Sequence, residues 1–368
     1  MKLIISLTLL ALCVFANAEV TTRWLNLRLD HFNPLETRTF DMRYFANSDH
    51  YLAGGPLFIY VGGGLEVYDE YLTRGAVFDI AVETNGYVFA LEHRYFGMSR
   101  PTPDTSVENL AFLNIHQTIA DIAQFVSFAK SNYYQTETSR VILFGRGYGG
   151  SLAVWARQKY PNLIDGVWAS SAPLDAVMEI PVALENAAYT IGSISGPECL
   201  GIVTAAFRQL DDAVRLRNTT WVEERFRLCS PIDIDVEEDV SRFFYGVASD
   251  VAINFISNAI YPEVDEKCFI LREEGALNDI DAFAKWYVDD FNKNQECLNF
   301  NNTAITAKYL EVEWDTISTV AGRRQNFWLQ CTQLGQFVTS NSENQPFGWR
   351  FQLNFFQRMC AEVFDSEM

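Results

Sequence analysis

One stretch of this sequence constrains the fold more than any other, because a run of glycines joins a buried strand to a helix. The apolar run Arg140–Phe144 predicts the strand, and the small apolar side chains of Leu152, Ala153 and Ala156 predict the helix. The turn between them has glycine at every second position, namely at Gly145, Gly147 and Gly149. Glycines at such positions allow a strand and a helix to approach closely. The stretch therefore predicts a strand–turn–helix unit of an α/β fold.

Further apolar runs predict the rest of a sheet. Compact runs at 56–61, 86–91 and 166–170 are typical of central strands that are buried on both faces. Apolar residues recur at three- and four-residue steps from Ile115 to Ala129, which predicts a helix that covers the sheet. This alternation of strands and helices predicts a mostly parallel sheet flanked by helices.

The sequence also divides into segments. Residues 1–18 combine a positive charge at Lys2, an apolar run and a small-x-small triplet, so we predict a cleaved signal peptide, with a membrane anchor as the alternative. Residues 19–175 form the predicted N-terminal part of the α/β core. After about Asp175 amphipathic helical patterns take over, and we predict a helical cap insertion at 176–345. Residues 346–368 are expected to begin the return to the core.

The glycine-rich turn has the pattern of a nucleophile elbow that lacks its nucleophile. In α/β-hydrolases a G-x-S-x-G turn presents the nucleophile at the middle position, in a strained backbone conformation. The middle position here is Gly147, which has no hydroxyl group to attack a carbonyl. The triad order in this fold is nucleophile, acid, histidine, so a histidine base must follow the elbow. All four histidines precede it, at His31, His50, His93 and His116.

Two alternative interpretations of the same turn were weighed against this one. A dinucleotide-binding turn is disfavoured, because G-x-G-x-G-G differs from G-x-G-x-x-G and because Arg146 and Tyr148 would crowd a pyrophosphate. A displaced nucleophile at Ser151 would lie one helical turn further on, where a serine hydroxyl bonds to backbone carbonyls. Neither a metal site nor a cofactor is predicted.

Charge and cysteine content restrict the partners and the compartment. The net charge of −19 makes nucleic acids and anionic membrane surfaces improbable ligands. Cys13 would leave with the signal peptide, and an even number of cysteines without a zinc-type spacing predicts disulfides in a secreted protein, with the pairing open. The disulfide candidates are Cys199, Cys229, Cys268, Cys297, Cys331 and Cys360. Asn218 and Asn301 begin N-glycosylation sequons, which fits export.

Several segments resemble a family of lysosomal and secreted serine exopeptidases that includes prolyl carboxypeptidase, dipeptidyl peptidase II and thymus-specific serine protease. The matching segments cover nearly the whole chain after the signal peptide: 29–33 with 43–45, 56–63, 91–101, 145–153, 160–173, 328–335 and 360–364. The resemblance implies an α/β-hydrolase core with a helical cap domain. It also implies a nucleophilic serine at the position of Gly147, and an acid and a histidine beyond residue 364. A chain that ends at Met368 would lack both, and the C-terminal part of the core would be missing.

The resemblance and the elbow together indicate which residues surround the site. Oxyanion-type donors are expected from the backbone of Tyr148 and from Gly63 or Gly64 in the turn after the first core strand. Gly64 stands where the family commonly has glutamate. The pocket candidates are Glu92, His93, Arg94 and Arg146.

Three functional hypotheses follow. The first is a secreted or lysosomal homologue of these exopeptidases that is catalytically inactive and binds a peptide or protein, with a homodimer also open. The second is an active serine exopeptidase that cleaves proline-containing peptides with a non-standard nucleophile. The third is a truncated record of such an enzyme.

Overall fold

The computed structural model describes residues 20–257, 261–273 and 279–365, which form two compact units. Unit 1 comprises residues 20–101 and His116–Pro173, and unit 2 comprises Thr102–Ile115 and residues 174–365. The predicted signal peptide at 1–18 lies outside the described residues. No helix in the described part of the chain combines the length and apolarity needed to cross a membrane.

Unit 1 is built on a six-stranded sheet of order β1-β2-β4-β3-β5-β6. The strands are β1 (Thr21–Arg28), β2 (Thr39–Asn47), β3 (Leu57–Val61), β4 (Tyr87–Leu91), β5 (Val141–Arg146) and β6 (Gly166–Ser170). Strands β4, β3, β5 and β6 run parallel, whereas β1 and β2 pair antiparallel at one side. The four predicted strands and the mostly parallel sheet are therefore confirmed. The β1–β2 hairpin was not predicted, because β1 is largely exposed and polar residues interrupt the apolar residues of the mostly buried β2.

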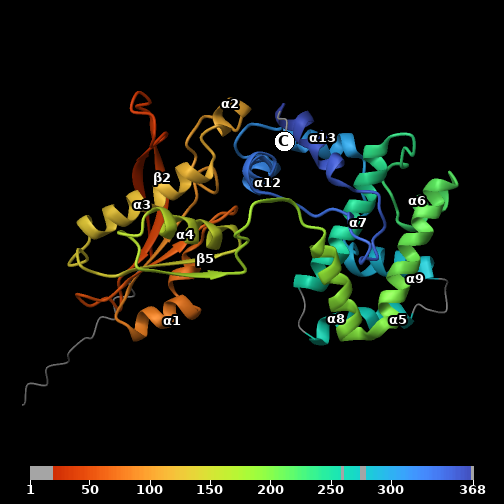
Figure 1. Cartoon of the computed structure of the whole chain (residues 1–368), viewed down its shortest axis with the longest axis horizontal. Coiled ribbons are helices and arrows are strands. Elements are labelled where there is room, and N and C mark those ends of the chain that lie inside the picture. Colours follow the sequence, from red (N-terminus) through yellow and green to blue (C-terminus); the bar gives the residue numbers. More distant parts are fainter. Residues whose placement is uncertain (1–19, 258–260, 274–278, 366–368) are drawn as a thin grey trace, which may run out of the picture. The chain divides into compact units, whose positions relative to one another are not determined.

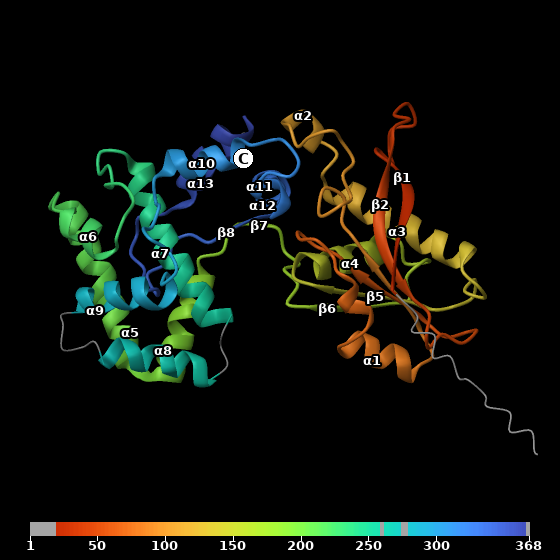
Figure 2. The same cartoon turned by 180° about the vertical axis from the view of Figure 1, so that it is seen from behind.

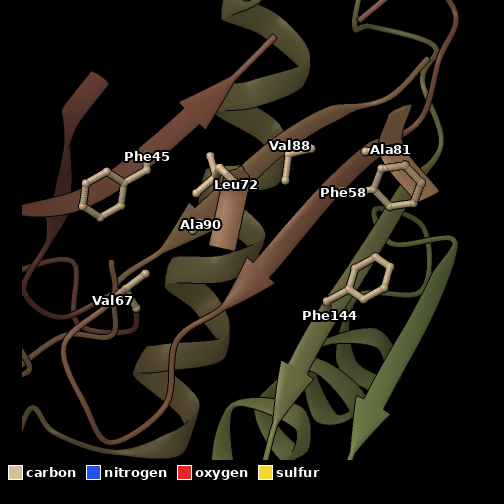
Figure 3. Close-up of a cluster of buried hydrophobic side chains, with 8 residues drawn as sticks. All are labelled: Phe45, Phe58, Val67, Leu72, Ala81, Val88, Ala90 and Phe144. Carbon is tan, nitrogen blue, oxygen red and sulfur yellow. The ribbon is translucent and has the colours of Figure 1, made fainter. Parts of the chain in front are cut away.

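Helices cover the two faces of this sheet. The helix α1 (Ala76–Glu83) lies on one side, and α3 (Ile115–Asn132) and α4 (Tyr148–Lys159) lie on the other (Figure 1, Figure 2). The short 3₁₀-helix η1 (Asp69–Leu72) supplies Leu72 to the core beneath α1. Alternate residues of a strand point to opposite faces. Figure 3 shows the core on the α1 side, which includes Phe58, Val88 and Phe144 from three neighbouring strands.

Unit 2 is almost entirely helical. It contains α2 (Val107–Leu110), α5 (Val182–Arg215), α6 (Thr220–Arg225), α7 (Glu237–Ser257), α8 (Tyr261–Glu273), α9 (Asp279–Trp286), α10 (Asn302–Leu310), α11 (Ile317–Val320), α12 (Arg323–Leu329) and α13 (Leu353–Phe364). Two π-helical turns, η3 (Tyr287–Phe291) and η4 (Gln330–Leu334), continue α9 and α12. A two-stranded sheet joins β7 (Val177–Glu179) to β8 (Gly335–Phe337). The long helix α5 is kinked at Gly196, just before Pro197, because proline cannot continue a helical hydrogen-bond ladder.

All six predicted disulfide cysteines are paired, and all three disulfides lie in unit 2. The pairs are Cys199–Cys268, Cys229–Cys297 and Cys331–Cys360. The sequence left this connectivity open, because it depends on which helices pack together. Helix α5 contacts α8, and this contact brings the first pair within bonding distance.

Two segments differ from the predicted division of the chain. Residues 102–115, which we counted with the core at 19–175, belong to unit 2, where the Thr105 N–H donates to the carbonyl of Val312 at 2.8 Å. The Trp314 indole N–H likewise donates to the carbonyl of Thr102 at 2.8 Å. Residues 346–365 are grouped with unit 2 as well, where α13 contacts α10 and α12. Both corrections rest on contacts across about 200 residues of sequence or between helices, which local patterns do not encode.

Candidate functional site

The elbow forms as predicted, with Gly147 at its apex. Strand β5 ends at Arg146 and helix α4 begins at Tyr148, so Gly147 alone makes the turn. Its backbone has φ 54° and ψ −129°, a conformation that is strained for any residue with a side chain. The Gly147 N–H donates to the carbonyl of Ser170 at 2.9 Å, and its carbonyl accepts from the N–H of Ser151 at 3.1 Å. The turn is thus fixed from both sides.

The three glycines of the elbow have different surroundings. A Cβ atom on Gly145 would lie 2.3 Å from the carbonyl oxygen of Gly149, and one on Gly149 would lie 2.4 Å from that of Val61. These two positions need glycine because β5, β3 and α4 approach closely there. A Cβ atom on Gly147 would have no atom within 4 Å. The fold therefore leaves open space at the apex, where hydrolases of this fold present their nucleophile, and here no atom fills it.

The predicted oxyanion-type donors lie beside the apex. A Cβ atom on Gly63 would be 2.9 Å from the backbone nitrogen of Gly149, so the turn after β3 touches the first turn of α4. Tyr148 directly follows the apex and begins the helix. Gly64 is half-buried in the same turn after β3. The backbone framework that would surround a carbonyl oxygen is therefore present without the attacking group.

His93 is buried beside this framework as a neutral residue. Its Nδ1 lies 2.6 Å from the carbonyl oxygen of Arg94, which cannot donate, so Nδ1 carries the proton. Its Nε2 must then accept, from the hydroxyl of Thr118 at 3.2 Å or that of Tyr148 at 3.3 Å. Burial lowers the pKa of His93 to about 4, and burial also raises the pKa of Tyr148 above its usual value. Both ring nitrogens are occupied, so His93 is not placed to act as a general base.

Glu92 holds the loop after β4 together and faces no ligand pocket. Its buried carboxylate accepts from the Met98 N–H at 2.9 Å, from the Ser99 N–H at 2.9 Å and from the Ser99 hydroxyl at 2.8 Å. It also pairs with the guanidinium of Arg43 at 2.5 Å. These bonds use its acceptor capacity within the protein.

Arg94 is equally committed to structure. The fully buried guanidinium binds Asp121 through two hydrogen bonds of 2.6 and 2.7 Å. The other partner of Asp121 is the Nε2 atom of His31 at 2.6 Å. Although burial raises it, the pKa of Asp121 lies below its usual value because of the charge of Arg94 and the hydrogen bonds from Arg94 and His31. The cavity that Glu92, His93 and Arg94 line measures only about 10 Å³, so these three pocket candidates are structural residues.

The remaining candidates lie away from the apex or point elsewhere. The buried Ser151 hydroxyl donates to the carbonyl of Pro173 at 2.6 Å, which does not favour its role as a nucleophile. The His50 ring packs edge-on against Phe78, and His116 is exposed on α3. None of the four histidines is therefore placed as a triad base.

Comparison with known proteins identifies the family. The model of the family described as serine carboxypeptidase S28 matches residues 27–368. The chain belongs to the serine carboxypeptidase S28 family. The fold confirms the α/β-hydrolase class predicted for it, since the mostly parallel sheet carries the glycine elbow between β5 and α4.

Individual S28 relatives resemble this chain at moderate identity. It is 27% identical over 359 residues to thymus-specific serine protease of Mus musculus, which covers 93% of this chain and 69% of the relative. It is 28% identical over 304 residues to lysosomal Pro-X carboxypeptidase of Homo sapiens, which covers 76% of this chain and 60% of the relative. A prolyl carboxypeptidase-like protein of Caenorhabditis elegans is 40% identical over 157 residues, or 41% of this chain and 31% of that protein. The chain spans two thirds or less of the length of most curated S28 relatives that it matches.

Arg146 is the one pocket candidate that faces solvent. It ends β5 opposite Ser170 of β6 and lines a pocket of about 230 Å³ on the sheet face.

The two predicted glycosylation sequons differ in their surroundings. Asn218 is exposed, whereas the side chain of Asn301 accepts from the Ala304 N–H and caps α10. In the part of the chain that the structure describes, no cluster of acidic, histidine or cysteine side chains could hold a metal ion.

Sequence reasoning missed the polar residues of α3 that complete the site's support. Thr118 and Asp121 bind His93 and Arg94 from the buried side of this helix. A signal was present, since both lie within the apolar periodicity from Ile115 to Ala129 that predicts a buried helical face. A buried polar residue on such a face implies a partner.

Proposed function

We propose that this chain is a member of the serine carboxypeptidase S28 family without peptidase activity, which binds the carbonyl or carboxylate group of a peptide at the elbow. The observation that carries the proposal is the apex itself: the turn has the strained geometry of a nucleophile position and open space around it, but its residue is Gly147. Without a hydroxyl, thiol or amine at the apex, no acyl intermediate can form there.

A missing base supports the same conclusion independently. His93 is the histidine that reaches the elbow, through the hydroxyl of Tyr148, and burial keeps it neutral with both nitrogens engaged. Among the residues that the structure describes, no histidine is placed to accept the proton of a serine restored at the apex. The proposal therefore draws on the identity of Gly147 and on the bonded state of His93.

Peptide binding is supported by the backbone N–H groups that remain near the elbow. The turn after β3 lies against the first turn of α4, and we propose that backbone N–H groups of these two turns bind the carbonyl or carboxylate oxygen. We further propose that the chain is secreted or lysosomal, which the predicted signal peptide and the three disulfides support. N-terminal sequencing of protein recovered from the medium of expressing cells should begin at Glu19.

The activity test uses the full chain and a fluorophosphonate probe, with human lysosomal Pro-X carboxypeptidase as the positive control. We expect labelling of the control and none of this chain, and no cleavage of proline-containing peptides. Gly147→Ser should remain unlabelled because both ring nitrogens of His93, the histidine beside the elbow, are already hydrogen-bonded, and Ser151→Ala should change nothing. Labelling of the chain that disappears in Ser151→Ala would establish a displaced nucleophile and overturn the proposal.

The binding test titrates proline-containing peptides onto the chain while amide signals of the elbow are followed by NMR. Shifts at Tyr148 and Gly63 that saturate with peptide concentration support binding at the elbow. Saturable shifts that leave both residues unmoved place the ligand elsewhere and contradict this part of the proposal.

A further inference from the structure

The face of the sheet that carries α1 continues beyond that helix as a row of aromatic side chains. Tyr60 of β3 is opposite Phe144 of β5, and Phe144 is opposite Trp168 of β6, so the three side chains share one face. The Phe144 and Trp168 ring centroids are 5.4 Å apart. Figure 3 shows Phe144 at the β5 side of the core cluster, next to β6. The row therefore leads from the buried core toward the edge of the sheet.

A pocket of about 230 Å³ lies on this row. Tyr60 stacks on Tyr71 with ring centroids 4.2 Å apart and an angle of 11° between the planes, and this pair forms one wall. Trp168 contributes another wall and is 47% exposed, and Tyr71 is 41% exposed. A ligand in the pocket could cover aromatic surface that now contacts water.

The charged residues that line the pocket are both arginines. Arg74 forms an exposed ion pair with Glu70, and such pairs contribute little. The Arg146 guanidinium has no hydrogen bond or ion pair with any residue that the structure describes, whereas its backbone belongs to the β5–β6 pairing. Its charge nevertheless reaches the pocket: burial and Tyr71 raise the pKa of Tyr60, and Arg146 opposes that rise. In a chain with a net charge of −19, this is a pocket lined by positive charge alone.

We propose that this pocket, formed by Tyr60, Tyr71, Phe144, Arg146 and Trp168, binds a small aromatic carboxylate. The aromatic ring of the ligand lies between the Tyr60–Tyr71 pair and Trp168, and its carboxylate accepts hydrogen bonds from the Arg146 guanidinium. A guanidinium presents parallel N–H donors that match a carboxylate, and it cannot lose its proton at physiological pH.

Size restricts the ligand further. Pockets for drug-sized molecules measure roughly 300–1,000 Å³, so this smaller pocket suits one ring with a short acidic arm. The pocket belongs to unit 1 alone and needs neither a nucleophile nor a base. Its occupancy is therefore independent of whether the chain cleaves peptides, and failure of one proposal leaves the other standing.

The experiment compares 3-phenylpropionate with its neutral amide, 3-phenylpropionamide, by titration of the full chain followed by NMR. For a ligand of this size we expect a Kd on the order of millimolar for the acid. The amide should bind about tenfold more weakly, because it loses a charge-assisted hydrogen bond. Acetyl-Gly-Gly-Phe is a larger ligand that also carries a phenyl ring and a carboxylate. Binding of both 3-phenylpropionate and this peptide supports the proposed site. Binding of the peptide alone contradicts a pocket of this size.

Three variants separate the roles of charge and ring. Arg146→Gln should abolish the preference for the acid over the amide, and Trp168→Ala should weaken both ligands while the preference remains. Arg140→Gln removes an exposed arginine outside the pocket, before β5, and should change neither. Thermal unfolding confirms that each variant is folded. Equal binding of acid and amide by the unmodified chain, or an unchanged preference in Arg146→Gln, would overturn the proposal.

Discussion

The geometry of the elbow predicts a different loss of stability for alanine at each of its three glycines. Gly145, Gly147 and Gly149 are separated by one residue each, yet the space around them differs. An alanine at Gly145 or Gly149 would place its Cβ atom 2.3 or 2.4 Å from a backbone oxygen, more than 1 Å closer than ordinary contact. Backbone in the centre of the sheet must then move. Gly147 has room for the methyl group but an unfavourable backbone conformation.

The expected costs follow from these two mechanisms. At Gly147 the φ of 54° with ψ −129° costs an alanine about 1–3 kcal/mol. At Gly145 and Gly149 the overpacking of rigid backbone should cost about 3 kcal/mol or more. For a unit the size of unit 1, about 4 °C per kcal/mol converts the first value to a loss of roughly 4–12 °C in Tm. The other two variants should lose at least 12 °C or fail to fold.

Thermal unfolding followed by hydrogen exchange of peptides from β5 reports on unit 1 selectively. The ranking matters more than the absolute values, because the three variants add the same methyl group within one turn. If Gly147→Ala is destabilised as strongly as Gly145→Ala, the apex is not the open position that the structure describes. The conclusion that the apex has open space for a side chain then fails.

Three further predictions concern the supports of the site. His93 has a folded pKa of about 4, below its ordinary 6.5, so its stability contribution is complete above pH 6.5 and falls by about 3 kcal/mol as the pH drops toward 4. Urea unfolding at pH 7.5 and 4.5 should show this extra loss in the unmodified chain and not in His93→Gln. Asp121→Asn leaves the Arg94 charge buried and should cost about 3–5 kcal/mol in urea unfolding. Glu36→Gln, in the pair with Arg38 at the surface, should cost far less, and equal costs would contradict the buried network. Replacement of Cys229 and Cys297 by serine opens a loop of 68 residues and should cost about 4 kcal/mol in unit 2, and non-reducing peptide mapping should recover this pair and not an exchanged one.

Local patterns in the sequence determined the central part of the fold and the residue at the apex of the elbow. Four strands follow from compact apolar runs, and β3 and β4 are buried on both faces as predicted. The prediction of a doubly buried strand was wrong for β6, which lies at the edge of the sheet with Trp168 and Ser170 exposed. Helix α3 follows from its periodicity. The residue at the apex, Gly147, is read directly from the sequence.

Tertiary structure decided what depends on contacts between distant residues. Glu92, His93 and Arg94 form one polar run in the sequence, but tertiary contacts turn them into buried structural residues. The loop after β4 binds Glu92, and α3 binds His93 and Arg94. The disulfide pairing and the place of residues 102–115 in unit 2 likewise depend on which helices meet. Arg146 stands beside Gly147 in sequence, and only the register of β5 with β3 and β6 sets it next to three aromatic rings. Sequence specifies such residues by type, but a partner across the fold fixes what each side chain can bind.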